Sequence, residues 1–205
     1  QEELEMLARK KVKHLYLGIE SGLDDVLKFM KKDHDLAQAY QAIDRLHEAG
    51  LIYDAHIMTG VAGKGRGMEN AEALAQFLNR TNPAHVVNFS MFLHKEVPLY
   101  QDIRQGTFVP ADELETIREE YHLIEIMAPK KAGANILYDG FHDFIHVRVR
   151  GHLPGDKEKM LAKLNGIIQE YEGKEPVYSF VQGECPDLEY CDDGKAVWDM
   201  DRKTS

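Results

Sequence analysis

The residues best suited to bind a ligand follow the first apolar stretch of this 205-residue chain, in the segment GIESG at positions 18–22. Alternation along a strand puts Gly18 and Glu20 on one face and Ile19 on the other. A carboxylate beside a glycine at a strand end suits a polar ligand that approaches the backbone closely. The alternative is a structural role, in which Glu20 caps the following helix or pairs with a lysine such as Lys28. The pattern alone gives the two roles about equal weight.

A second candidate is the glycine-rich loop GVAGKGRG, residues 60–67. A nucleotide phosphate loop requires G-x-x-x-x-G-K-[ST], whereas Gly65 is followed here by Arg66 and Gly67, so the sequence excludes that motif. The loop glycines can still expose backbone N–H groups to a carboxylate or a phosphate. The competing interpretation is a flexible loop in which the glycines serve only the turns.

Patterns for metal binding are weak. Cys185 and Cys191 are the two cysteines, and two thiols at this spacing fit neither a C-x-x-C pair nor a four-iron cluster. His142 and His146 are four residues apart, but on a predicted strand this spacing does not give the shared ligand geometry of a helix. We therefore expect free thiols and ordinary surface or core histidines, and we assign no metal ligand.

Composition narrows the class of protein. The formal net charge of −10 and the pI of about 5.5 argue against nucleic acid as the main partner, since neutralising phosphates requires clustered Lys and Arg. No apolar run approaches the roughly 18 residues of a spanning helix, so we expect a cytoplasmic protein without a membrane partner. The sequence opens at Gln1 and leads almost at once into a strand, which suggests a piece of a longer chain.

The elements that must position these residues alternate in type. Apolar stretches at residues 12–20, 51–59 and 85–92 are separated by helical patterns, which predicts βαβ units and a parallel sheet. Their crossovers should be right-handed. In such units functional residues collect where strands end and loops begin, which is where both candidate segments lie.

The pattern changes after residue 109. Residues 110–127 predict a long amphipathic helix, and residues 135–150 predict a β-hairpin that turns at Asp139-Gly140. A last helix should begin after Asp156 as its N-cap. From Gly173 onward the acidic tail predicts partial disorder. We accordingly divide the chain into residues 1–128 and a C-terminal extension of residues 129–205.

Four segments in this order resemble the radical S-adenosylmethionine (SAM) superfamily. LYLGIESGLDDVLKFMKK (15–32) is similar to the fourth barrel strand and helix of that family, and HEAGLIYDAHIMTGVAGK (47–64) to its fifth strand. HVVNFSMFLHKEVPLYQDIRQGTF (85–108) resembles the sixth strand, and LPGDKEKML (153–161) a stretch of members related to oxygen-independent coproporphyrinogen oxidases. The resemblance, which extends to proteins of the Elp3, MiaB and NifB type, covers roughly residues 10–172.

The resemblance implies an α/β fold, the C-terminal half of a partial (β/α)6 TIM-like barrel with a hairpin-plus-helix extension. It also implies an enzyme in which a [4Fe–4S] cluster on a C-x-x-x-C-x-x-C loop reduces SAM to a 5′-deoxyadenosyl radical. That loop does not occur in these 205 residues. The intact protein is therefore expected to be an enzyme, and this chain alone to generate no radical.

The resemblance further assigns roles to single residues. Glu20 and Ser21 match positions that contact the ribose and the methionine end of SAM, Met58, Thr59 and Gly60 match a segment beside the adenine, and Lys32 falls where a basic residue can face the methionine carboxylate. The predicted cofactor-binding residues are Gly18, Glu20, Ser21, Lys32, Met58, Thr59 and Gly60.

Besides the missing cluster cysteines, the sequence lacks the three strands that should precede Val12, and it departs from the family pattern at two turns. The turn glutamate of the family is Lys64 here, and its P-G-T segment has become residues 95–98, KEVP. A non-catalytic β/α binding module would use the same strand ends. An interaction protein would instead associate with another chain, or with itself, through the edge of a truncated barrel. The sequence does not identify the small-molecule substrate.

Overall fold

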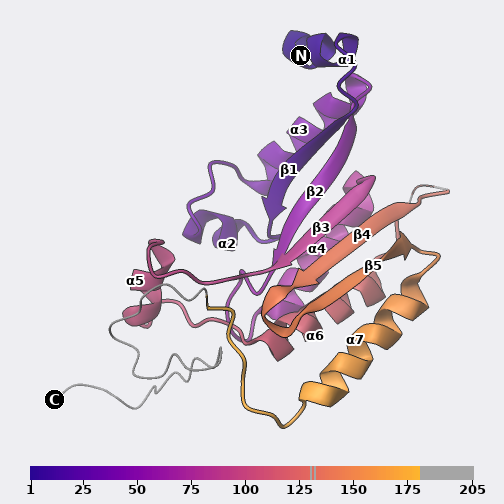
Figure 1. Cartoon of the computed structure of the whole chain (residues 1–205). Helices are drawn as coiled ribbons and strands as arrows, with labels where there is room; N and C mark the ends of the chain where they lie inside the picture. The colour runs from indigo at the N-terminus through magenta and orange to yellow at the C-terminus, as the bar shows by residue number, and fades with distance from the viewer. Residues whose placement is uncertain (130, 132, 181–205) are drawn as a thin grey trace.

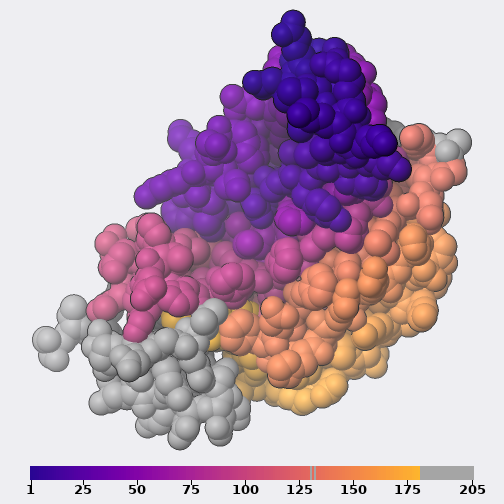
Figure 2. Space-filling view, turned by 45° about the horizontal axis from the view of Figure 1, so that its top comes forward, coloured from indigo at the N-terminus to yellow at the C-terminus, as the bar shows by residue number. Residues whose placement is uncertain are grey.

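A computed structural model describes residues 1–129, 131 and 133–180, and these residues form a single sheet with helices around it (Figure 1). The order of strands across the sheet is their order along the chain, β1-β2-β3-β4-β5. The strands are β1 (His14–Glu20), β2 (Ile52–Thr59), β3 (His85–Ser90), β4 (Ile136–His142) and β5 (Val147–Leu153). In Figure 2 the colours follow one another across the surface from indigo to yellow, as this order requires.

The first three strands lie as the sequence predicts. β1 pairs with β2 and β2 pairs with β3, both in parallel, with His14 opposite Ile52 and Ala55 opposite Val86. β4 then adds a fourth parallel strand beside β3, and β5 closes the sheet in the antiparallel direction. Because the four parallel strands run the same way, their carboxyl ends meet at one edge of the sheet.

The helices connect the strands and cover one face of the sheet. Figure 1 shows α3, α4 and α6 on the same face, and α7 packs against α6 and β5. Within the described ranges no helix is long and apolar enough to cross a membrane. The helices are α1 (Glu2–Arg9), α2 (Asp24–Phe29), α3 (Leu36–Glu48), α4 (Gly67–Thr81), α5 (Leu99–Arg104), α6 (Glu113–Ile126) and α7 (Lys157–Tyr171), with a short 3-10 turn at Asp143–Ile145.

Strand alternation separates a buried face from an open one. On β2, Tyr53, Ala55 and Ile57 face the helices and are at most 1% exposed. Ile52 and Met58 alternate with them and point to the opposite face, where Ile52 is 39% exposed. This open face corresponds to the lumen of a closed barrel, so the α/β partial-barrel architecture predicted from the sequence is confirmed.

The turn predicted at Asp139-Gly140 is wrong. Both residues lie inside β4, and the hairpin turns later, where the 3-10 turn ends at His146 in a left-handed conformation with φ of 54°. Gly140 is needed for packing instead, since a Cβ placed on it would lie 1.8 Å from Oε1 of Glu120. An Asp-Gly pair is typical of a hairpin turn, and the sequence alone offers no other reason for this glycine. The actual reason is a close contact with a helix that is distant in the sequence.

Residues after position 128 extend the same sheet. β4 contributes to the parallel ladder through pairs such as Val87 with Asp139, and α7 buries Met160, Leu161 and Leu164 in the common core. Asp156 precedes α7 as predicted, although its carboxylate accepts a hydrogen bond from the backbone N–H of His152 and does not cap the helix. The hairpin and last helix are thus an addition to one sheet.

We predict that Gly140→Ala lowers the free energy of unfolding by about 1–3 kcal/mol, because the added methyl group must displace the buried carboxylate of Glu120. Chemical denaturation followed by circular dichroism measures this change. Gly166→Ala is the matched control: Gly166 lies inside α7, and a Cβ placed on it would have nothing within 4 Å, so alanine should stabilise the helix by about 0.5–1 kcal/mol. Equal stability of wild type and Gly140→Ala would contradict the close packing described here.

Candidate functional site

Six of the seven predicted site residues lie at the carboxyl ends of β1 and β2, and Lys32 follows α2. Gly18, Glu20 and Met58 are partly exposed and alternate with buried neighbours, so they belong to the open face. Ser21 and Thr59 are completely buried. The seven residues therefore form two groups, one that borders the open face and one that lies between the sheet and the helices.

Glu20 has an unusual backbone. Its φ of 61° is in the left-handed region, and the β1–β2 register shifts between Gly18 and Glu20. Non-glycine residues adopt this conformation rarely, and such residues concentrate at functional sites. The bulge turns the Glu20 carboxylate toward Lys32, whose Nζ donates to Oε1 at 3.2 Å.

Gly18 makes this arrangement possible. A Cβ on Gly18 would lie 2.8 Å from Oε1 of Glu20 and 3.7 Å from Nζ of Lys32. The glycine thus leaves room for the carboxylate to fold back over the strand. Of the two structural roles considered for Glu20, the structure shows an ion pair, with Lys32 as the partner in place of Lys28; the N-cap of α2 is Leu23.

Side chains on the helix side of the sheet hold the end of β2. Gly60 has a φ of 81°, and a Cβ there would lie 2.6 Å from Cγ2 of Thr116, so glycine is required at this turn. Its backbone N–H donates to Oε2 of Glu119 at 2.8 Å. The N–H of Thr59 donates to Oδ1 of Asn88 at 3.1 Å. Side chains from α6 and β3 therefore hold the backbone of the strand end.

The end of β1 is held in a similar way. The hydroxyl of Ser21 donates to Oδ1 of Asn70 at 2.6 Å and accepts from the N–H of Leu23 at 3.1 Å. The N–H of Gly22 donates to the same Asn70 oxygen at 3.3 Å. The Ser21 hydroxyl consequently points toward α4, on the side of the sheet opposite the Glu20 carboxylate.

Three buried carboxylates of α6, those of Glu113, Glu119 and Glu120, accept hydrogen bonds from residues that hold the strand ends. Oε1 of Glu119 accepts from Nδ2 of Asn70 at 2.6 Å, which links the ends of β1 and β2 through one residue pair. Oε1 of Glu120 accepts from Nδ2 of Asn88 at 3.0 Å and from the hydroxyl of Tyr138 at 2.9 Å. The helix thus presents hydrogen-bond acceptors to neighbouring strands from within the core.

His142 lies between the other two carboxylates. Its Nε2 lies 3.0 Å from Oε2 of Glu120, and its Nδ1 lies 3.1 Å from Oε2 of Glu113. The other oxygen of Glu113 accepts from the hydroxyl of Ser90 at 2.9 Å, at the end of β3. Since both ring nitrogens face carboxylate oxygens, the doubly protonated, cationic imidazole satisfies both contacts.

Burial and charge act in opposite directions on these groups. For His142, burial lowers the pKa, but the charge and hydrogen bond of Glu120, together with Glu113, outweigh it and raise the pKa to about 10. For Glu119, burial raises the pKa to about 8, although the hydrogen bonds from Asn70 and Gly60 favour the ionised form. A cationic His142 therefore balances part of the buried negative charge at neutral pH.

Sequence reasoning missed these carboxylates, although one signal was present. Glu113 and Glu120 are seven residues apart, which puts them on the same face of a helix. In a helix with an amphipathic pattern, charged residues are assigned to the solvent side by default. The partners that make their burial favourable come from β3 and β4, and no local pattern reveals them.

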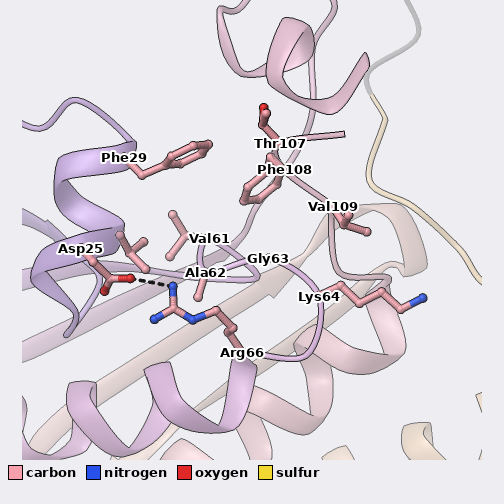
Figure 3. Close-up of a pocket in the computed structure, with 11 residues that line it drawn as sticks. Asp25, Phe29, Val61, Ala62, Gly63, Lys64, Arg66, Thr107, Phe108 and Val109 are labelled. Atoms are coloured by element: carbon pink, nitrogen blue, oxygen red, sulfur yellow. Dashed lines mark hydrogen bonds and ion pairs between the residues drawn. The ribbon is translucent and has the colours of Figure 1, made fainter. Parts of the chain in front are cut away.

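A cleft of about 380 Å³ opens beside the glycine-rich loop (Figure 3). Phe29 and Phe108 stack at 5.8 Å between ring centroids on one side, and Arg66 donates to Asp25 at 2.8 Å on the other. A Cβ on Gly63 would lie 2.9 Å from the carbonyl oxygen of Val109, so this glycine allows the loop to approach the opposite wall. The cleft is lined by α2, the glycine-rich loop and residues 107–109, and by no residue of a strand.

Aromatic and histidine side chains cover much of the open face. Phe89 is 36% exposed and stacks on Phe141 at 5.6 Å, while Tyr16 is 50% exposed and its hydroxyl lies 2.9 Å from Nδ1 of His85. At the far side, Arg148 makes two hydrogen bonds to Asp139 at 2.8 and 2.7 Å and lies over the ring of Phe141. Arg150 lies 3.6 Å from the same carboxylate, so two arginines share one negative charge. The face can therefore accept both apolar rings and an anionic group.

Metal ligands are not brought together in the part of the chain that the structure describes. Among those residues, no group of three or more His, Cys, Asp or Glu side chains could hold a metal ion. Cys185, Cys191 and the rest of the acidic tail after position 180 lie outside the described residues. His142 is a buried residue of the α6 network, and His146 is the exposed left-handed residue of the hairpin turn.

Comparison with known proteins identifies the family to which this fold is similar. The sequence profile of the Radical SAM superfamily matches residues 1–78, which confirms the resemblance over the segment that holds Gly18, Glu20 and Lys32. The chain is 25% identical over 118 residues to a tRNA uridine(34) acetyltransferase of Methanocaldococcus infernus. That match includes 57% of this chain and 22% of the relative, so the chain spans about a fifth of the length of that protein.

A solved structure shares the fold. The archaeal Elp3 of Methanocaldococcus infernus, lacking N-terminal residues 1–46, superimposes with a TM-score of 0.61 at 18% sequence identity. The match covers 83% of this chain and 39% of that one. The shared fold therefore includes elements that follow residue 78, where the match to the family profile ends.

We predict that His142→Gln lowers the free energy of unfolding by about 3 kcal/mol near pH 6.5, because two buried carboxylates lose their cation. A pKa raised from 6.5 to about 10 gives stabilisation that is complete below pH 6.5 and is lost as the pH rises through 10. The difference in melting temperature between wild type and variant should therefore shrink between pH 6.5 and 10.

The control for this experiment is His152→Gln, since the His152 side chain is exposed on β5. In melting curves recorded at pH 6.5, 8 and 10, the difference in melting temperature between this control and the wild type should stay the same. A constant gap between wild type and His142→Gln across this range would contradict a cationic His142.

Proposed function

We propose that this chain supplies SAM-binding strand ends and a substrate-facing sheet surface to a radical SAM enzyme. The observation that carries the proposal is the pairing of Glu20 with Lys32 over Gly18, at the carboxyl end of the open face. A carboxylate and an ammonium held side by side suit a ligand that carries hydroxyl groups and a carboxylate of its own. Ribose and the methionine end of SAM supply these groups.

The residues present fit this cofactor. In the proposed site the Glu20 carboxylate accepts hydrogen bonds from the ribose hydroxyls, and the Lys32 ammonium faces the methionine carboxylate. Met58 borders the open face one strand away, beside the backbone of Gly60. Ser21 and Thr59 contribute through their backbone positions, since both side chains are buried. When bound beside a reduced cluster, SAM supplies the radical that enzymes of this superfamily use.

An iron–sulfur cluster does not fit the residues of this chain. The 205 residues contain two cysteines, separated by five residues, whereas the family binds its cluster through a three-cysteine C-x-x-x-C-x-x-C loop. We propose that a [4Fe–4S] cluster is held elsewhere in the intact protein. This chain contributes binding, orientation and exclusion of water.

The substrate is proposed only as a class. The relative at 25% identity is named for a tRNA uridine, and the match spans 22% of that protein. The aromatic and arginine side chains of the open face favour a small molecule with an apolar ring and an anionic group. We place the protein in the cytoplasm, and its net charge of −10 disfavours nucleic acid as the main partner.

The second candidate function is an interaction module that associates with itself. Exposed apolar side chains on the open face favour it, among them Tyr16 at 50%, Ile52 at 39% and Phe89 at 36%. Light scattering coupled to size-exclusion chromatography tests this function. A dimer that Phe89→Ser dissociates would support the interaction module, and a monomer at all concentrations would remove it.

We predict that Glu20→Gln in the intact enzyme weakens SAM binding by about 10- to 100-fold, since charge-assisted hydrogen bonds contribute about 1.5–3 kcal/mol each. Isothermal titration calorimetry with SAM measures the affinity. The fold should survive, because Glu20 lies at a strand end and is not part of the core.

Glu48→Gln is the matched control, as Glu48 is an exposed acid at the end of α3. It should bind SAM with wild-type affinity. A Glu20→Gln protein that melts at a lower temperature yet binds SAM as tightly as wild type would assign Glu20 a structural role and remove it from the site.

A further inference from the structure

We propose that Asn70 and Glu119 are positioning residues of the SAM site, acting from the helix side of the sheet on the two strand ends that border it. The inference rests on the proposed function. Asn70 accepts hydrogen bonds from the hydroxyl of Ser21 and the N–H of Gly22, and Glu119 accepts from the N–H of Gly60. The 2.6 Å hydrogen bond between Asn70 and Glu119 joins the two ends.

The hydrogen bonds of this pair have a fixed direction. Oδ1 of Asn70 already accepts from a hydroxyl and a backbone N–H, so its amide nitrogen must point toward Glu119. Glu119 then receives a donor on each oxygen, from Nδ2 of Asn70 and from the N–H of Gly60. Among the similar-sized side chains only an ionised carboxylate accepts on both sides, and because burial raises the Glu119 pKa to about 8, the variants are compared at a pH above that value.

Because the Asn70–Glu119 pair is buried, reversing a donor and an acceptor within it should disturb the backbone of the strand ends. Ser21, Asn70 and Glu119 are each 0% exposed, so water cannot replace a lost partner. A donor placed against Gly60 or Asn70 must therefore push the backbone of one strand end away. Glu20 directly precedes Ser21, and Met58 lies two residues before Gly60, so such a shift reaches the residues of the open face.

The test exchanges the roles of the two side chains. Glu119→Gln sets an amide N–H₂ against a donor, and Asn70→Asp sets two buried carboxylates against each other. In the double variant N70D/E119Q, the glutamine donates to the aspartate and still accepts from Gly60, while the aspartate accepts from Ser21 and Gly22. The double variant restores all hydrogen bonds of the pair, and the negative charge lies on residue 70 in place of residue 119.

SAM affinity of the intact protein, measured by calorimetry, should fall at least about tenfold in each single variant and return to within about threefold of wild type in the double variant. Leu164→Ala is a destabilised reference, because Leu164 is completely buried on α7 and takes part in none of the hydrogen bonds that hold the strand ends. It should keep wild-type SAM affinity at temperatures well below its melting point. Recovery of SAM affinity in the double variant then reports the positions of the strand ends and not the stability of the fold.

Each result has a defined meaning. Wild-type affinity in Glu119→Gln, or equal loss in the double variant and the single variants, would overturn the positioning role while the proposed function stands. Failure of the wild-type protein to bind SAM would remove both proposals. Should Glu119→Gln not fold, Glu119→Asp replaces it: this variant keeps the charge, withdraws the oxygens by one methylene, and should weaken SAM binding about tenfold.

Discussion

The architecture depends on carboxylates buried between α6 and the ends of the parallel strands. Past the last ladder bond, the backbone groups of a parallel strand need new partners, and a strand end covered by a helix cannot use water. Here Glu119 accepts from Gly60, and Asn88, held by Glu120, accepts from Thr59. Burying this much acid requires compensation, which a cationic His142 provides.

This constraint explains how the open face is left free for a ligand. Because side chains on the helix side hold the strand ends, Glu20 and Lys32 are not needed to support the fold and can remain partly exposed at the bulge. The glycines follow the same division. Gly18 leaves space for the Glu20 carboxylate on the open side, and Gly60 leaves space for Thr116 on the helix side.

Local patterns in the sequence predict those features that depend on periodicity along the chain. Strand alternation correctly separates Gly18 and Glu20 from Ile19, and the order of βα units correctly predicts parallel neighbours. Such patterns fail where the determining contact is distant. The sequence places Gly140 in a turn because its contact with Glu120 comes from another element, and local patterns do not reveal the buried carboxylates of α6 for the same reason.

Hydrogen exchange at the amide of Gly60 tests this account most directly. Its N–H lies at a strand end, beyond the ladder, and its acceptor is the buried Glu119. The account predicts protection of Gly60 comparable to that of Ala55 in the middle of β2, with exchange only on global unfolding. Gly65, whose N–H bonds to Glu115 on the surface, should exchange much faster. Exchange of Gly60 as fast as that of Gly65 would contradict the claim that α6 holds the strand ends.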